Sequence, residues 1–276
     1  MKVKKISIAV ASAAAISLGL ISLTGSVNAS ASPALKGTLR PAIHLAHPAT
    51  TNAQSIPIDY SGNWSGYVAT PKTGKAKAFK AVSANYSVPS VNCSATNYAF
   101  SYHWVGLDGW TDGTVEQDGV GSFCVSGSPV YFAWYEMYPA GAVEEFSANP
   151  GDAITSSVTY NGAGNYSLAL TDQTTGQNFN VSENCASTCN NSSAEVITEG
   201  YTSAPYQGTA DFGQEHYDTA SVTGAAGATG GLTGPNWNTL ESIALGGTTN
   251  SPDTEPGPLY TAPKQSAFAL SWLQEN

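Results

Sequence analysis

Basic residues are scarce in this chain of 276 residues, which holds ten Lys and Arg against twenty Asp and Glu. The imbalance is greatest from Asp59 onward, where five basic and all twenty acidic residues give a formal net charge of −15. A surface with that charge repels phosphates, so nucleic acid is excluded as a partner. The same charge suits an acidic medium, in which protonation of some carboxyls relieves the repulsion between them.

Histidine and long apolar stretches are also scarce, which narrows the possible chemistry. Only His103 and His216 lie beyond residue 58, neither is in a metal-ligand spacing, and no Gly-x-Ser-x-Gly segment marks a nucleophilic serine. We therefore interpret each His as a structural or surface residue and expect no metal or cofactor, so catalysis would depend on carboxyl and amide side chains. Beyond residue 29 no stretch approaches the roughly 18 apolar residues that a membrane span requires.

The first 29 residues have the pattern of a secretory signal peptide. Three lysines precede an apolar stretch over 6–23, and Val-Asn-Ala at 27–29 fits a small-residue cleavage site. The apolar stretch is also long enough for an uncleaved membrane anchor, which remains as an alternative. Cleavage is the favoured interpretation, and it predicts a secreted protein with no membrane attachment once residues 1–29 are removed.

Residues 30–58 predict a basic leader without packed structure. The segment is rich in Ala, Pro, Ser and Thr, has no acidic residue, and contains Lys36, Arg40, His44 and His47. We expect this propeptide to dock on an acidic cleft of the body as an inhibitor, and to be released when carboxyls protonate at low pH. A plain linker is the alternative.

From residue 59 to 276 the sequence predicts one all-β domain. Short runs rich in Val, Tyr, Phe, Thr and Trp alternate with Gly, Asn, Pro and Asp turn signals, and no apolar stripe of helical period appears. The expected strands are 64–69, 81–88, 98–107, 130–138, 153–160, 166–171, 178–182, 195–199, 221–223, 240–245 and 267–272. They indicate an antiparallel sandwich or barrel, with a long surface loop over 224–234.

Four cysteines, an even number in an exported chain, predict disulfides. Of the three possible connectivities we favour Cys93–Cys124 with Cys185–Cys189. The close spacing of Cys185 and Cys189 would also suit a metal site or a redox pair, but no nearby His or second Cys pair completes a zinc set. A structural bridge is therefore preferred.

Five motifs occur in a fixed order along the predicted domain. They are NWSG at 63–66, WVGLDG at 104–109, EQDGV at 116–120, AWYEMYP at 133–139 and SAEVITE at 193–199. In this order and spacing the sequence resembles the glutamic peptidase (eqolisin) family from residue 63 to about residue 272. The resemblance implies an acid endopeptidase that acts on polypeptides, and a sandwich of two packed antiparallel sheets of the concanavalin-like or jelly-roll type. We expect a monomer.

The resemblance also assigns site residues. Gln117 corresponds to the family's catalytic glutamine and Glu195 to its catalytic glutamate. Substrate-binding positions in the same cleft are implied for Asp108, Trp104, Trp134, Glu136 and Tyr138.

The sequence departs from the family's motifs around these residues. Glu116 and Asp118 flank Gln117 where the family usually has Leu and Thr, and Met137 and Val196 stand where it usually has Trp. These departures bear on specificity more than on the reaction.

A second question is which glutamate acts. Glu195 and Glu199 share one face of a strand because side chains alternate with period two. Glu195 is favoured for its Ser-Ala-Glu context, and Glu199 remains the alternative.

The proposed pair suits the chemistry of amide hydrolysis, which needs a base for water, an acid for the leaving amine and a donor for the oxyanion. One Glu can act first as base and then as acid, and a Gln amide donates without titrating. For Glu195 to be ionised at low pH, we expect hydrogen bonds that keep its pKa low. Glu136 lies in the apolar run 132–137, and an in-strand carboxylate there is expected to face a cleft or a partner.

Two other functions fit parts of the sequence. A β-sandwich glycosidase could use Glu136 and Glu195 as paired carboxyls, and in a retaining enzyme they would lie about 5–5.5 Å apart, with no role for Gln117. A carbohydrate-binding or adhesion module could use exposed Trp and Tyr for stacking on sugars. The second reading leaves the basic leader and the contexts of Gln117 and Glu195 without explanation.

Overall fold

Strands account for all the regular structure that the computed structural model describes. The described residues are 44–51, 54–74, 77–185, 188–200, 208–245, 252–260 and 266–274, with only the backbone described over 44–50. They contain 17 strands and no helix, which confirms the predicted all-β class. None of these residues therefore belongs to a helix that could cross a membrane.

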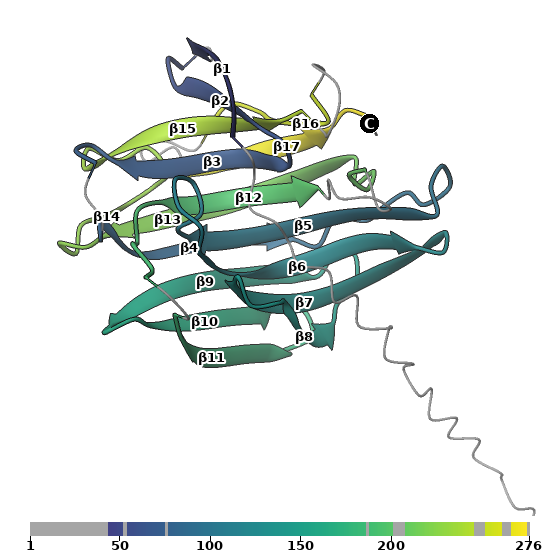
Figure 1. The fold of residues 1–276 in the computed structure, drawn as a ribbon. Helices are drawn as coiled ribbons and strands as arrows, with labels where there is room; N and C mark the ends of the chain where they lie inside the picture. The colour runs from purple at the N-terminus through teal and green to yellow at the C-terminus, as the bar shows by residue number, and fades with distance from the viewer. Residues whose placement is uncertain are drawn as a thin grey trace, which may run out of the picture. The chain divides into compact units, whose positions relative to one another are not determined.

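The strands form two layers (Figure 1). The first layer has the order β1 (His44–Thr51), β2 (Pro57–Ser61), β15 (Trp237–Ala244), β3 (Trp64–Pro71), β12 (Ala194–Gly200), β5 (Tyr98–Leu107), β6 (Val115–Val125), β7 (Ser128–Tyr138) and β8 (Val143–Ser147). The second has the order β16 (Thr254–Pro256), β17 (Phe268–Trp272), β13 (Gln214–Gly224), β4 (Phe79–Ser87), β9 (Ala153–Gly162), β10 (Asn165–Asp172) and β11 (Asn178–Asn184), with β14 (Thr229–Gly230) paired to β13. Strands β15 and β16 join the layers, and only β2 and β15 pair in parallel among these strands.

The main core lies between the two layers, because strands of both layers direct alternate apolar side chains toward it. Val105 of β5 and Val196 of β12 meet Val82 of β4 and Val158 of β9 in one buried cluster. This period-two burial is the pattern that the sequence predicted for a sandwich.

A second buried cluster lies on the other face of the first layer. It holds Trp64, Phe100, Tyr102, Trp104, Trp110, Phe123, Phe132 and Trp134, and we call it the aromatic face. Trp64 meets Trp104 edge to face, with ring centroids 4.8 Å apart, and Tyr102 meets Trp134 at 5.0 Å. Edge-to-face pairs of this kind add to the stabilisation that burial of the rings provides.

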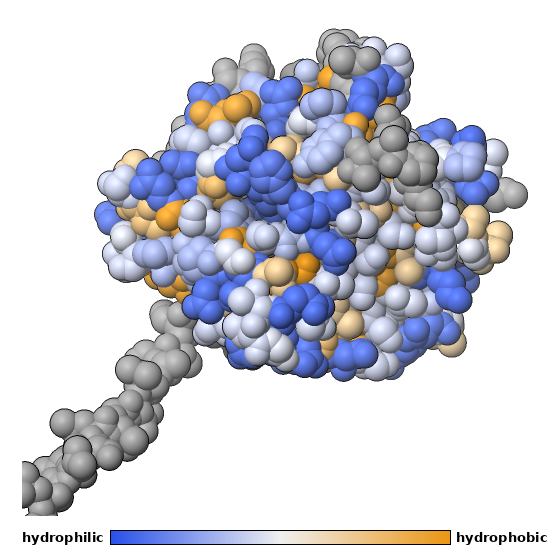
Figure 2. Space-filling view, turned by 180° about the vertical axis from the view of Figure 1, so that it is seen from behind, coloured by the Kyte–Doolittle hydropathy of each residue, from blue (hydrophilic) through white to orange (hydrophobic). Residues whose placement is uncertain are grey.

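Both favoured disulfides, Cys93–Cys124 and Cys185–Cys189, are present. His103 is a core residue, as interpreted: its Nδ1 lies 2.5 Å from Oε2 of Glu215 and its Nε2 3.0 Å from the Ser101 hydroxyl. Elsewhere the surface is mainly polar, and Figure 2 shows apolar side chains scattered in small groups over one face of the molecule.

The structure differs from the sequence-based expectation in the leader. Residues 44–51 form β1, which pairs with β2, and β2 in turn pairs with β15. Ile56 is buried, and the Gln54 side chain both donates to and accepts from the backbone of Leu259, at 2.8 and 2.9 Å. The second half of the segment 30–58 is therefore packed against the body, because the side chain of Ile56 is buried and β1 pairs with β2. Residues 1–43 lie outside the described part of the chain.

Candidate active site

Glu195, Gln117 and Glu136 lie in one row across the first layer. Glu195 of β12 pairs with Gly106 of β5, Gly106 pairs with Gln117 of β6, and Gln117 pairs with Glu136 of β7. Residues directly opposite each other in antiparallel strands project to the same side of a sheet. The three predicted site side chains therefore share the side that carries the aromatic face.

Gly106, which pairs with both Glu195 and Gln117, leaves room for the ring of Trp104. A Cβ at this position would lie 2.8 Å from the Trp104 ring and 3.3 Å from Cβ of Gln117. Any other residue would therefore push against the side chains that flank the row. The two proposed catalytic residues, Glu195 and Gln117, therefore lie on either side of a residue that has no side chain.

Gln117 and Glu136 are joined by a hydrogen bond. Nε2 of Gln117 donates to Oε2 of Glu136 at 2.7 Å, and both side chains are buried. Burial raises the pKa of Glu136 to about 8, although the bond from Gln117 lowers it. Glu136 is thus neutral in acid, and its Oε2 accepts the hydrogen bond from the NH2 group of Gln117.

Glu195 is fully buried, and no described residue makes a hydrogen bond to either of its carboxylate oxygens. Burial raises the pKa of Glu195 well above its usual range, and the nearby Ser193 hydroxyl offsets this only in part. The expectation of hydrogen bonds that keep this pKa low is therefore wrong. The reason is that Glu195 lies near the start of β12 between β3 and β5, where the backbone donors are used by the sheet.

Glu199 lies on the same side of β12 but in another row, opposite Tyr102. Its Oε1 accepts a hydrogen bond from Nδ2 of Asn63 at 2.6 Å, and its Oε2 accepts one from Nε1 of Trp104 at 3.2 Å. Both oxygens of Glu199 are thus engaged by donors, in contrast to those of Glu195. Burial raises the pKa of Glu199 well above its usual range, and the charge of Glu136 adds to the rise.

The predicted aromatic positions surround this row. Trp104 and Trp134 are fully buried members of the aromatic face, and the partly buried Tyr138 packs against it. Trp104 is also the residue that binds Glu199. The structure therefore brings these three side chains to the face that carries Gln117 and Glu195.

Asp108 differs from the other predicted site residues. Its carboxylate accepts hydrogen bonds from the backbone N–H groups of Asn190, Asn191 and Ser192, at 2.8, 2.8 and 2.6 Å. The carboxylate is therefore occupied by the loop before β12. These bonds give no indication of the contact with a substrate that the sequence suggested for Asp108.

Glu116 and Asp118, the unusual neighbours of Gln117, project to the opposite side of β6. Asp118 is fully buried and accepts a hydrogen bond from the Ser156 hydroxyl of β9, in the second layer. Burial raises the pKa of Glu116 to about 10. Strand alternation thus removes both acids from the side of Gln117, which could have been inferred had 115–125 been recognised as a strand.

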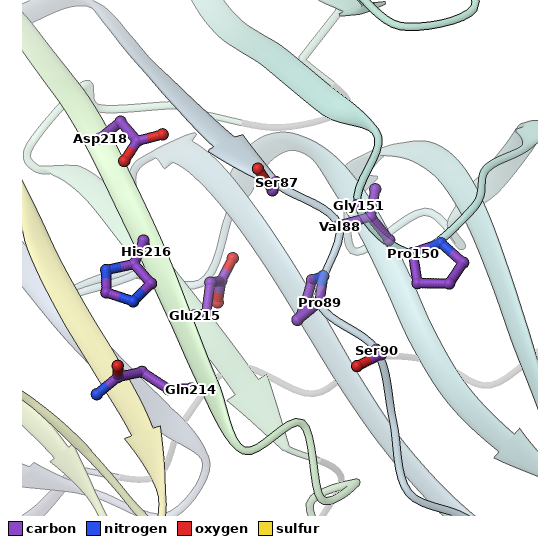
Figure 3. Close-up of a pocket in the computed structure, with 10 residues that line it drawn as sticks. All are labelled: Ser87, Val88, Pro89, Ser90, Pro150, Gly151, Gln214, Glu215, His216 and Asp218. Carbon is purple, nitrogen blue, oxygen red and sulfur yellow. The ribbon is translucent and has the colours of Figure 1, made fainter.

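Two other places could be taken for sites. Among the described residues, one group, Glu116 with Cys185 and Cys189, has the proximity of metal ligands, but the two cysteines are bonded to each other. A pocket of about 550 Å³ lies beside β13 and includes His216 and Asp218 (Figure 3). It contains none of the predicted site residues.

Comparisons with known proteins bear on the family and the fold of the chain. Residues 62–252 match the peptidase A4 family model. The crystal structure of scytalido-glutamic peptidase with a peptide-based transition-state analogue is 25% identical, with a TM-score of 0.63, over 77% of this chain and 98% of that chain. Aspergilloglutamic peptidase from Aspergillus niger is 25% identical, with a TM-score of 0.53, over 63% of this chain and 99% of that chain.

A third solved structure supports the fold alone. SCP-B, a member of the eqolisin family in complex with the tripeptide Ala-Ile-His, is 24% identical with a TM-score of 0.60, over 77% of this chain and 98% of that chain. No curated protein sequence matches the chain. Because the family model covers more than half of the chain and the solved glutamic peptidases share its β-sandwich, the chain belongs to the peptidase A4 family, the glutamic peptidases.

Proposed function

We propose that the protein is a secreted acid endopeptidase in which Glu195 is the general base and acid and Gln117 the oxyanion donor. The observation that carries the proposal is the single row in which Glu195 and Gln117 flank Gly106. A scissile carbonyl bound between Glu195 and Gln117 would have a base on one side and an amide donor on the other. The solved scytalido-glutamic peptidase holds a peptide-based transition-state analogue, which supports a peptide as substrate here.

In the proposed reaction Glu195 takes a proton from water as the oxygen attacks the carbonyl carbon. The carbonyl oxygen gains negative charge and accepts a hydrogen bond from Nε2 of Gln117. Glu195 then gives the proton to the leaving nitrogen, the C–N bond breaks, and the carboxylate is restored. One proton moves twice, so no second acid is needed.

The raised pKa of Glu195 has two consequences for this reaction. A carboxylate with a raised pKa is a stronger base, so burial favours the protonated state that follows attack by water. The same burial reduces the ionised fraction at low pH. A bound water that donates to the carboxylate would favour its ionised form and offset part of that loss.

Glu195 is preferred to Glu199 because of their hydrogen bonds. Asn63 and Trp104 already donate to the two oxygens of Glu199, whereas those of Glu195 have no partner among the described residues. Glu195 is also the one of the two that lies in the row of Gln117. Glu199 instead holds Trp104 in the aromatic face.

The geometry does not favour the glycosidase alternative. Two strands, β5 and β6, separate Glu136 from Glu195, which places their backbones about 14 Å apart at the usual strand spacing. Paired carboxyls of a retaining glycosidase lie about 5–5.5 Å apart. In this row Gln117, and not Glu136, is the polar group next to Glu195 across Gly106.

The proposal includes export and activation: residues 1–29 are removed as a signal peptide, and residues 30–58 restrain the enzyme until acidification. Incubating the purified precursor in acid, with a peptide substrate and N-terminal sequencing, tests both parts. Wild type should cleave the peptide and shed residues 30–58. Gln117→Ala should lose about 10²–10³-fold in kcat, the typical loss for one oxyanion donor, and Glu195→Gln at least as much.

Thermal unfolding of these variants is the control and should stay near that of wild type. Glu199→Gln should keep most of the activity. Full activity in a folded Gln117→Ala protein would refute the oxyanion role. Loss of activity in Glu199→Gln with retention in Glu195→Gln would move the catalytic assignment four residues along β12.

A further inference from the structure

Asp108 binds every residue of the four-residue loop 190–193, which leads into β12. Its Oδ2 accepts hydrogen bonds from the backbone N–H groups of Asn190 and Asn191, and its Oδ1 accepts one from that of Ser192. The backbone N–H of Asp108 in turn donates to the carbonyl oxygen of Ser193 at 3.2 Å. Consecutive backbone N–H groups that converge on one carboxylate form a strong, charge-assisted anchor.

Asp112 also links the turn after β5 to the loop 190–193, through hydrogen bonds that its side chain accepts. Its Oδ2 accepts hydrogen bonds from Nδ2 of Asn190 at 3.0 Å and from the Ser192 hydroxyl at 2.9 Å. Its Oδ1 accepts one from the backbone N–H of Gly109 at 2.8 Å, which closes the turn after β5. Two carboxylates therefore connect the end of β5 to the start of β12.

These bonds lie beside the catalytic row. Asp108 follows Gly106 by two residues, and Glu195 follows Ser193 by two residues. Gly106 is the residue that pairs with both Glu195 and Gln117. A displacement of the loop would therefore move Glu195 relative to Gln117, and a misplacement of about 1 Å can cost about 10²-fold in rate.

The backbone conformation and the burial of Asp108 cost free energy of folding, so packing alone does not account for them. Asp108 has a φ of 71°, in the left-handed region that residues other than Gly seldom adopt. Its carboxylate is fully buried, and burial raises its pKa although the backbone N–H groups of Ser192 and Asn191 lower it. Neighbouring Asp112 raises it further. Strain and buried charge of this kind persist only where the surroundings hold them firmly.

We infer that Asp108 is a positioning residue, which holds Glu195 in register with Gln117 through its hydrogen bonds to the loop 190–193. It touches neither substrate nor reacting atoms. The inference rests on the proposed function, because it concerns the placement of the proposed base. It replaces the substrate contact that the sequence suggested for Asp108.

The test is Asp108→Asn in the full chain after acid activation. The variant keeps the shape of the side chain but turns an NH2 group toward backbone N–H donors, so at least one bond to the loop is lost. We expect kcat to fall about tenfold or more while KM changes by less than about threefold. Hydrogen exchange at the amides of Asn190, Asn191 and Ser192 should become faster.

Asp172→Asn is the matched control. Asp172 is also fully buried, and its Oδ1 accepts the backbone N–H groups of Thr174 and Thr175 in the turn after β10, in the second layer. This variant removes the same kind of bond far from the row. It should lower thermal stability to a similar degree and leave kcat unchanged.

A wild-type kcat in Asp108→Asn, with faster exchange at 190–192, would overturn the inference. If that variant fails to fold, Asp108→Gly decides, because glycine tolerates the φ of 71° and the change removes all three carboxylate bonds to the loop. It should lower kcat at least tenfold, and an unchanged kcat would also overturn the inference. Failure of the proposed function has a different signature, which is wild-type activity in Glu195→Gln. A dead Glu195→Gln beside a fully active Asp108→Asn would reject the positioning role alone.

Discussion

Gln117 and Glu195 are both buried in one row, yet burial affects them differently. The Gln117 amide has no proton to gain or lose between pH 2 and 8, so its capacity to donate is independent of pH. The carboxyl of Glu195 has a raised pKa because of burial. The acid limb of activity should therefore report the glutamate and not the glutamine.

Glu136 provides a prediction at the same scale. Its pKa of about 8 means that it is neutral in acid, and Gln is a close mimic of a neutral carboxyl. Glu136→Gln should therefore keep kcat within about tenfold of wild type at acidic pH. Glu136→Ala removes the acceptor that orients Gln117 and should lose about fivefold more. Steady-state kinetics of both variants at one acidic pH measure the difference.

An outcome in which Glu136→Gln is as inactive as Glu195→Gln would contradict this prediction, because it would mean that Glu136 transfers a proton. Glu255→Gln, which changes an exposed carboxyl, serves as the control.

Single residues also show what the sequence could reveal. The resemblance of the motifs to the family predicted that Gln117, Glu136 and Glu195 belong to one cleft, and the register places them in one row. Asp108 could not be placed in this way. It follows the end of β5 in a turn, where side-chain direction depends on φ and on a loop that begins 82 residues later in the sequence, rather than on period two.

Among the elements, the strand with the strongest pattern was predicted best. The expected strand 98–107 agrees with β5 in both bounds, because its aromatic residues occupy alternate positions from Tyr98 to Trp104. Strand β6, which carries Gln117, was not predicted, since Glu116, Asp118 and three glycines within 119–127 resemble a turn. Its strand state is imposed by β5 and β7 on either side, and no local propensity reveals that.

The glycines of β6 lead to a prediction for this element. A Cβ at Gly119 would overlap the carbonyl oxygen of His103 and lie 2.8 Å from Cα of Trp104, both in β5. Backbone atoms of a paired strand cannot move aside without disturbing the sheet. Gly119→Ala should therefore lower the free energy of unfolding by about 1–3 kcal/mol, or Tm by several degrees, as measured by calorimetry.

Gly141→Ala is the matched control, because a Cβ there meets no atom within 4 Å. It should change stability by less than about 0.5 kcal/mol. Equal Tm values for Gly119→Ala and wild type would show that β5 and β6 approach less closely than the structure indicates.

For the whole molecule, the buried carboxyls determine how stability changes with pH. The folded-state pKa of Glu136 is about 8 and that of Glu116 about 10, against an ordinary value of 4.5. A raised pKa means that the folded state binds the proton more tightly than the unfolded state. Its contribution to stability is complete below about pH 4.5 and is lost as pH rises toward 8.

We therefore expect the free energy of unfolding to fall between pH 4.5 and 8, by at most about 1.4 kcal/mol per pH unit for each such carboxyl. Urea unfolding at several pH values measures the slope. Glu136→Gln should make the slope shallower, whereas Glu255→Gln, at an exposed position, should leave it unchanged. A stability that rises from pH 4.5 to 8 would contradict the prediction.

The aromatic face gives the molecule an optical reporter of its own chemistry. Four of the six tryptophans, Trp64, Trp104, Trp110 and Trp134, belong to the cluster that surrounds the catalytic row. Indole emission depends on local polarity, so a peptide that binds between Glu195 and Gln117, beside the Trp104 ring, should change the intensity and wavelength of the intrinsic fluorescence. Substrate docking could then be followed by stopped flow in the uncleaving Glu195→Gln protein, with no label attached, and separated in time from bond cleavage.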